Sequence, residues 1–251
     1  MTSPGPGSPL PPLPWRLGAG PPPPPSADPL PLLLLIDRRD PLAPSRRAAL
    51  PTLLSPAECQ RHAAFRQPDD QERYLVARAA LRELLGHWLE RPPAAVTIEV
   101  GPHGKPSCAG APAFNLSHSG DLILLAFHGG GGEVGVDVEQ ARPNLDWRSI
   151  AERVLSRPEV AALGELPAPE QARGFLQAWC RLEARLKADG EGLAGLEQLR
   201  AGDAERDGPG FLHLWDVAVP PGYAAAVAAR GAGLMGPRAA GAGACRSNPP
   251  Q

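Results

Sequence analysis

The 251-residue sequence has few cysteines, few aromatic residues and no long hydrophobic run. Its four cysteines are scattered without a CxxC pair, so we predict neither a structural zinc site nor a disulfide framework. The longest apolar run, residues 32–36, is far too short to span a bilayer, and the features of a signal peptide are missing around it. Together these absences favour a protein of the reducing cytoplasm, without a membrane partner.

The chain also lacks an excess of either charge. It has 25 lysines and arginines against 27 acidic residues, a formal net charge of −2. No overall field draws it to nucleic acid or to a membrane surface, so we expect neither as a partner. Any phosphate binding must therefore come from a local cluster of residues. Apolar residues make up 43% of the chain, enough for one large domain or two small ones of about 100 residues each.

Proline, in contrast, is abundant at the N-terminus, where 13 of the 33 prolines fall within the first 31 residues. This composition predicts a disordered or polyproline II leader over residues 1–30. A glycine- and alanine-rich stretch predicts a flexible tail over residues 231–251.

The residues between these ends show mixed helix and strand patterns. Buried strands are predicted at 32–36, 122–127, 134–139, 212–219 and 223–229. Helices are predicted to begin at Ser55 and to cover 72–89, 145–154 and 171–189. Strands 122–127 and 134–139 are expected to form a hairpin. The order predicts an α+β fold of two similar lobes, 31–133 and 134–230, each a small antiparallel sheet packed with helices.

The sequence Val-Gly-Val-Asp-Val-Glu at 134–139 places two acids on one side of a strand. Side chains alternate along a strand, so the valines point into a core while Asp137 and Glu139 share the opposite face. Carboxylates that close repel unless a cation lies between them, and carboxylate oxygens are the ligands that Mg²⁺ prefers. From these six residues alone, an exposed acidic face is the favoured interpretation.

Helix 171–189 carries a third acid. Its predicted buried stripe is Phe175, Trp179, Leu182 and Leu186, which leaves Glu183 at the rim of the buried face. Lys187 follows one turn later. Taken alone, these two charges favour an ordinary surface pair at i and i+4.

Upstream lie three further polar features, each unremarkable by itself. Phe-Asn-Leu-Ser-His-Ser at 114–119 contains a histidine before a buried strand, and Gly-Lys-Pro places Lys105 in a rigid loop. Arg73 and Arg82 lie on helix 72–89. Individually they indicate a turn, a hydrogen-bonded loop histidine and solvated cations.

Their joint order is more specific. The chain carries in order an arginine-bearing helix, Gly-Lys-Pro, Phe-Asn-Leu-Ser-His-Ser, Val-Gly-Val-Asp-Val-Glu and then Trp-x-x-x-Glu-Ala-x-x-Lys-x-x-Gly-x-Gly-Leu. This order of motifs closely resembles that of the Sfp-type phosphopantetheinyl transferases. The resemblance covers about residues 50–229. It implies a pseudo-twofold α+β fold with coenzyme A between the lobes. It also implies transfer of 4′-phosphopantetheine from coenzyme A to a serine of an acyl or peptidyl carrier protein, releasing adenosine 3′,5′-bisphosphate.

The resemblance further implies residue roles. Mg²⁺ on the pyrophosphate is expected to be held by Asp137, Glu139 and Glu183, with Lys187 facing the same phosphates. Contacts to coenzyme A are expected from Arg73, Lys105, Ser117, His118 and Lys187. The carrier serine needs a base, and we predict Glu183, directly or through a metal-bound water. We expect a monomer, as is usual in this family.

One residue departs from the family pattern, and three alternatives stay open. Leu182 stands where the family commonly has lysine, and Arg181 is a candidate substitute. A non-catalytic member that binds coenzyme A or carrier protein is one alternative. The others are a different Mg²⁺-dependent phosphotransferase, although no Walker sequence occurs, and a scaffold that acts through its proline-rich leader.

Overall fold

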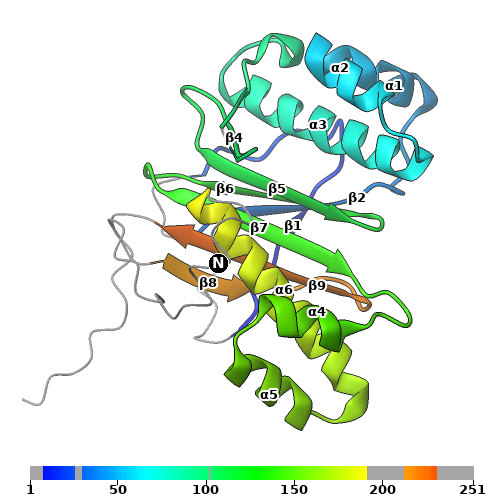
Figure 1. Ribbon diagram of the computed structural model, residues 1–251. Helices are drawn as coiled ribbons and strands as arrows, with labels where there is room; N and C mark the ends of the chain where they lie inside the picture. The colour runs from blue at the N-terminus through cyan, green and yellow to red at the C-terminus, as the bar shows by residue number, and fades with distance from the viewer. Residues whose placement is uncertain (1–7, 26–29, 102, 191–211, 231–251) are drawn as a thin grey trace, which may run out of the picture.

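A computed structural model describes residues 8–25, 30–101, 103–190 and 212–230 (Figure 1). Within these ranges the predicted α+β class is confirmed. Two sheets pack against each other, and each has a helix on its outer face. None of the described helices is long and apolar enough to cross a membrane.

The first sheet has four strands in the order β1-β2-β6-β5. Its strands are β1 (Leu13–Pro14), β2 (Leu32–Asp37), β5 (Ala113–Ser119) and β6 (Leu122–His128). Strand β6 lies at the centre, antiparallel to both β2 and β5. One face packs on helix α3 (Pro68–Trp88) through Ile123, Leu125 and Phe127, while Leu122, Leu124 and Ala126 alternate toward the second sheet.

The second sheet has three antiparallel strands in the order β7-β9-β8. They are β7 (Glu133–Gln140), β8 (Leu212–Asp216) and β9 (Tyr223–Arg230). The hairpin predicted between β6 and β7 is therefore wrong, because these strands belong to different sheets. Both edges of β6 are taken by β2 and β5, so the chain crosses after β6 to begin the second sheet.

Helix α6 (Ala168–Asp189) covers the outer face of this second sheet (Figure 1). The residues that face the sheet are Leu176, Cys180, Ala184 and Ala188, at a spacing of four. The predicted buried stripe is only partly correct, since Phe175, Trp179 and Leu182 pack instead on α4 (Trp147–Val154) and α5 (Arg157–Glu165). The helix thus has two apolar contacts, with Glu183 and Lys187 left to face the acid-bearing strand.

The remaining short elements surround α3. They are α1 (Pro44–Ala49), η1 (Leu50–Leu53), α2 (Pro56–Ala63), η2 (Pro93–Ala95), β3 (Glu99–Val100) and β4 (Pro106–Ser107). The helix start predicted at Ser55 is confirmed as a capping box with Glu58. Helix α5, which was not predicted, begins with the same arrangement between Ser156 and Glu159.

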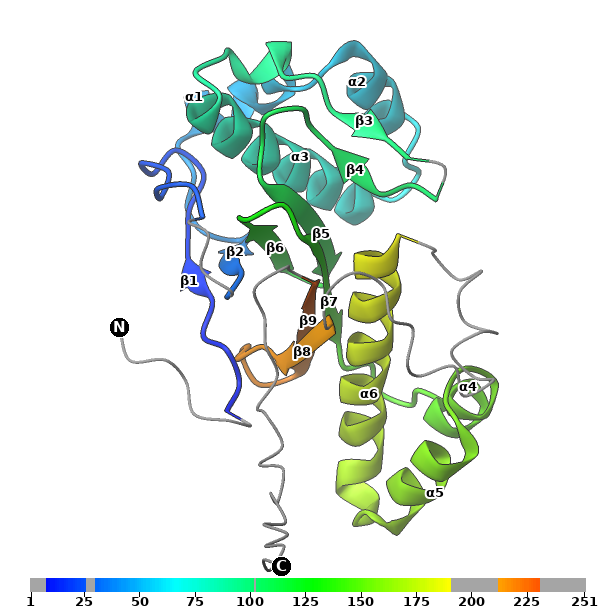
Figure 2. The ribbon, with the colours of Figure 1, turned by 90° about the vertical axis from the view of Figure 1, so that its left-hand side faces the viewer.

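Residues 8–25 of the expected disordered leader lie against both sheets, and we call them the N-terminal strap. Leu10 pairs with Val217 beyond the end of β8, and Trp15 N donates to Leu35 O at 2.9 Å. Trp15 is only 5% exposed and joins the core under α3. Figure 2 shows the strap in blue, running from beside β8 past β2 toward α1. These residues of the leader, which was expected to be disordered or polyproline II, thus have fixed contacts, because apolar anchors lie among the prolines.

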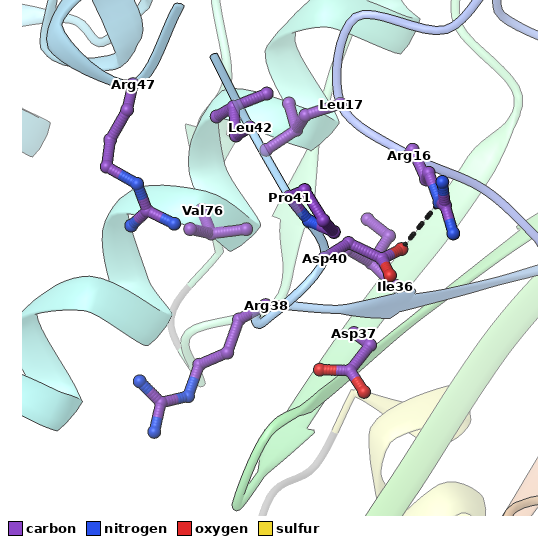
Figure 3. A pocket seen from close by; sticks show the side chains of 10 residues that line it. All are labelled: Arg16, Leu17, Ile36, Asp37, Arg38, Asp40, Pro41, Leu42, Arg47 and Val76. Carbon is purple, nitrogen blue, oxygen red and sulfur yellow. Dashed lines mark hydrogen bonds and ion pairs between the residues drawn. The ribbon is translucent and has the colours of Figure 1, made fainter. Parts of the chain in front are cut away.

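The strap also closes over charged groups at the end of β2. Figure 3 shows a pocket there, lined by Arg16, Leu17, Ile36, Asp37, Arg38, Asp40, Pro41, Leu42, Arg47 and Val76. Arg16 Nε lies 3.0 Å from Asp40 Oδ2 across it. A larger cavity of about 420 Å³ lies beside Trp15 and Leu35.

Candidate functional site

The acid-bearing strand is oriented as the alternation predicted. Val134, Val136 and Val138 of β7 lie in the core between the sheets. Asp137 and Glu139 therefore lie on the face toward α6. Asp137 is only 3% exposed, and Glu139 is half-buried.

Strand β5 supports β7 through alternate polar side chains. Ser117 Oγ donates to Asp137 Oδ1 at 2.8 Å, and Ser119 Oγ donates to Glu139 Oε2 at 2.7 Å. Backbone groups of β7 are satisfied as well, because Val136 N donates to Asn115 Oδ1 at 3.1 Å. A strand edge without a ladder partner needs such acceptors for its N–H groups.

This use of the Phe-Asn-Leu-Ser-His-Ser motif was not predicted. Sequence reasoning assigned Ser117 to coenzyme A and gave Asn115 and Ser119 no role. The structure places all three between β5 and β7, each no more than 8% exposed. The available signal was the period-two polar pattern at 115, 117 and 119, which marks one face of a strand.

Helix α6 brings two more charged groups to this seam. Lys187 Nζ lies 2.6 Å from Asp137 Oδ1 and 3.3 Å from both Ser117 Oγ and Val136 O. Glu183, one turn earlier, is half-buried. The close approach is possible because β7 has glycine at 135, where a Cβ would lie only 2.8 Å from Lys187 C and closer still to other backbone atoms of α6.

Burial and mutual repulsion shape the electrostatics of the acids. Desolvation raises the pKa of Glu139. The hydrogen bond from Ser119 partly offsets this increase, and the charge of Asp137 adds to it. Desolvation also raises the pKa of Glu183, against the lowering effect of Lys187, while Asp137 and Glu139 add to the increase. The charge of Asp137 therefore acts on both glutamates, and that of Glu139 acts on Glu183.

The carboxylate oxygens of Asp137, Glu139 and Glu183 are suitable donor atoms for a magnesium ion. All three supply the hard oxygens that Mg²⁺ prefers, and Asp137 Oδ2 is buried without a hydrogen-bond partner among the described residues. Within those same ranges, no group of three or more acidic, histidine or cysteine side chains has an arrangement that could hold a metal ion as it stands. Asp137 Oδ1 instead accepts hydrogen bonds from the ammonium group of Lys187 and from Ser117 Oγ.

The other predicted residues flank this cluster. His118 lies on the opposite face of β5 and is exposed, yet desolvation lowers its pKa, and the charges of Arg73 and Lys187 lower it further. Arg73 Nη1 donates to Gly120 O at 3.1 Å. Lys105 pairs with Glu133 and donates to Ala188 O at 2.7 Å, so its amine lies at the C-terminal end of α6.

The departure at Leu182 has a packing explanation. Its side chain joins the apolar contact of α6 with α4 and α5. Arg181 does not take the place of the family lysine beside the acids. Its guanidinium lies 2.7 and 2.8 Å from the two carboxylate oxygens of Asp216, and this pair fastens α6 to β8.

Comparisons with known proteins agree with this arrangement. Residues 133–216 match the 4′-phosphopantetheinyl transferase superfamily, and residues 42–129 match the family described as 4′-phosphopantetheinyl transferase, N-terminal. A Synechocystis protein provisionally named as a 4′-phosphopantetheinyl transferase is 34% identical over 171 residues, which are 66% of this chain and 68% of the relative. The chain belongs to the 4′-phosphopantetheinyl transferase superfamily.

Two named relatives specify the enzyme class. The 4′-phosphopantetheinyl transferase HetI of Nostoc is 35% identical over 155 residues, 60% of this chain and 65% of HetI. The 4′-phosphopantetheinyl transferase AcpT of Salmonella typhimurium is 46% identical over 92 residues, 36% of this chain and 47% of AcpT. These alignments support a phosphopantetheinyl transferase enzyme, while they span half to two thirds of the relatives' lengths.

Proposed function

We propose that the protein transfers 4′-phosphopantetheine from coenzyme A to a serine of an acyl or peptidyl carrier protein, with Mg²⁺, and releases adenosine 3′,5′-bisphosphate. The observation that carries this proposal is the meeting of Asp137, Glu139 and Lys187 at one seam, with Glu183 near enough to feel their charges. Family membership supports the same reaction.

The residues divide the chemistry among them. Asp137, Glu139 and Glu183 would hold Mg²⁺, which when bound would neutralise charge on the pyrophosphate as its phosphoanhydride bond breaks and adenosine 3′,5′-bisphosphate leaves. Glu183 is proposed to accept the proton of the carrier serine, whose hydroxyl needs a base to act as a nucleophile. Ser117 and Ser119 hold the two acids of β7 in place.

Coenzyme A is proposed to lie between two lobes, residues 31–133 and 134–230, related by a pseudo-twofold axis. Support comes from the topology, since the chain leaves the four-stranded sheet after β6 and starts the other sheet at β7. Lys187 is proposed to face the pyrophosphate, and Arg73, Lys105, Ser117 and His118 the remainder of coenzyme A. We propose that the protein acts as a cytoplasmic monomer without nucleic-acid or membrane partners.

The test is mass spectrometry of an apo carrier protein incubated with this protein, coenzyme A and Mg²⁺. We expect a gain of one phosphopantetheine mass on a serine, abolished by EDTA and by Asp137→Asn or Glu183→Gln. Arg173→Gln, an exposed site on α6, is the matched control and should retain transfer. Binding of coenzyme A without any mass gain would contradict the proposal and favour a non-catalytic member of the family.

A further inference from the structure

The ammonium group of Lys187 occupies a defined position rather than extending into solvent. It lies 2.6 Å from Asp137 Oδ1 and 3.3 Å from both Ser117 Oγ and Val136 O. The lysine side chain is 29% exposed, and that of Asp137 only 4%. A charge-assisted hydrogen bond of this length, largely shielded from water, is a strong contact for both partners.

Lys187 also has a possible ion-pair partner on its own helix. Glu183 lies one turn earlier on α6, where a Glu–Lys pair is the ordinary arrangement on a helix surface. The ion pair that the structure gives Lys187 is with Asp137. Its charge still lowers the pKa of Glu139 and of Glu183. One ammonium group therefore serves as counter-charge to three carboxylates.

A divalent cation bound at Asp137 would meet this ammonium. Lys187 Nζ lies 2.6 Å from Asp137 Oδ1, so a Mg²⁺–oxygen distance of about 2.1 Å would place an ion bound at Oδ1 within roughly 5 Å of the amine unless Lys187 moved. Two positive charges that close repel in a partly buried site. The phosphates of coenzyme A offer the displaced amine another anionic partner.

We propose that Lys187 is an internal counter-cation, which holds Asp137 in the empty enzyme and competes there with the divalent ion. Binding of coenzyme A transfers the ammonium from Asp137 to phosphate and so frees the carboxylate. Metal and coenzyme A consequently strengthen each other's binding. The coenzyme A half of this inference rests on the proposed function, whereas the competition at Asp137 does not.

The experiment measures Mn²⁺ binding by electron paramagnetic resonance, first without and then with coenzyme A. Without coenzyme A, Lys187→Gln should bind Mn²⁺ about tenfold more tightly than the wild type, because one repelling charge is gone. Lys187→Arg keeps the charge and should stay close to wild type. Arg173→Gln removes one charge about 20 Å along the same helix and should leave Mn²⁺ affinity nearly unchanged.

The second titration tests the coupling. Coenzyme A should strengthen Mn²⁺ binding by a larger factor in the wild type than in Lys187→Gln, where only the direct contact of the ion with the pyrophosphate couples the two. Unchanged or weaker Mn²⁺ binding by a folded Lys187→Gln protein would overturn the inference. So would equal coupling in the two proteins.

A measurement on the wild type alone keeps the inference testable if Lys187→Gln fails to fold. Reductive methylation followed by peptide mass spectrometry reports how accessible the amine is. Saturating Mg²⁺ should increase the labelling of Lys187 relative to the protein's other lysine, Lys105, and an unchanged ratio would contradict the competition. A missing transfer product together with confirmed competition would reject the proposed function while leaving the counter-cation role intact.

Discussion

Replacing Gly135 by alanine tests how closely α6 must lie against β7. A Cβ at this position would lie 2.8 Å from Lys187 C and closer still to Ala184 O and Ala188 N, all of them backbone atoms. Ordinary contact begins near 3.4 Å, so the helix must move away by at least 0.6 Å. Because backbone cannot rotate aside as a flexible side chain does, we expect the whole helix to shift.

We expect Gly135→Ala to lower both the stability of the protein and its transfer rate. Overpacking of a well-packed interface costs about 1–3 kcal/mol, and we expect the upper part of this range because the three atoms nearest to the new methyl group are all backbone. The same shift lengthens the 2.6 Å contact between Lys187 and Asp137. Misplacement of site residues by about 1 Å can cost roughly a hundredfold in rate, so we expect transfer to fall at least tenfold.

Urea denaturation measures the first effect, and carrier-protein mass gain over time measures the second. Gly164→Ala is the matched control, since its Cβ would meet nothing closer than Arg148 Nη2 at 4.0 Å. Within helix α5 this control should be neutral or stabilising by up to about 1 kcal/mol. A Gly135→Ala protein with wild-type stability and turnover would refute the reasoning about the close helix–strand contact.

Three further predictions concern other parts of the chain. Trp15→Ala should lower the free energy of unfolding by about 3–5 kcal/mol in urea titration, because the strap loses its buried anchor; a loss below 1 kcal/mol would mean that the strap does not hold the sheets. Ser119→Ala should weaken Mn²⁺ binding in the presence of coenzyme A about 10- to 100-fold, since the hydroxyl that orients Glu139 is gone, and equal affinity would exclude this support role. Burial raises the pKa of the Cys180 thiol, so iodoacetamide should modify Cys180 far more slowly than the partly exposed Cys59. Peptide mass spectrometry of the native protein after labelling measures both rates, and equal rates would contradict this burial.

Local periodicity predicted the features that depend on one segment. Alternation along β7 correctly separated the valines from Asp137 and Glu139, because successive side chains of a strand must point to opposite faces. The helix-start rule at Ser55 was equally reliable, since a cap needs only residues within one turn.

Features that depend on distant partners could not be predicted in this way. Pairing of β6 with β2 rather than β7 depends on a strand almost 90 residues earlier. The face of α6 at the sheet carries Ala184 and Ala188, whose small side chains give a weak hydrophobic signal although Gly135 lets the backbones approach there. In the leader, the abundance of proline masked two apolar anchors, Leu10 and Trp15.

The candidate site divides along the same line. Its acids could be named from motifs, whereas the supporting contacts of Asn115, Ser117 and Ser119 join strands of different sheets. Nor could the sequence show that Lys187 lies on Asp137, because a lysine side chain long enough to reach phosphate also reaches the neighbouring strand.

The central claim is that Asp137, Glu139 and Glu183 together hold one divalent ion. Its most direct test is the stoichiometry and affinity of Mn²⁺ binding in the presence of coenzyme A. The account predicts one Mn²⁺ per chain, with binding strongly weakened in each of Asp137→Asn, Glu139→Gln and Glu183→Gln and retained in Arg173→Gln. Wild-type Mn²⁺ affinity in all three acid variants would contradict it.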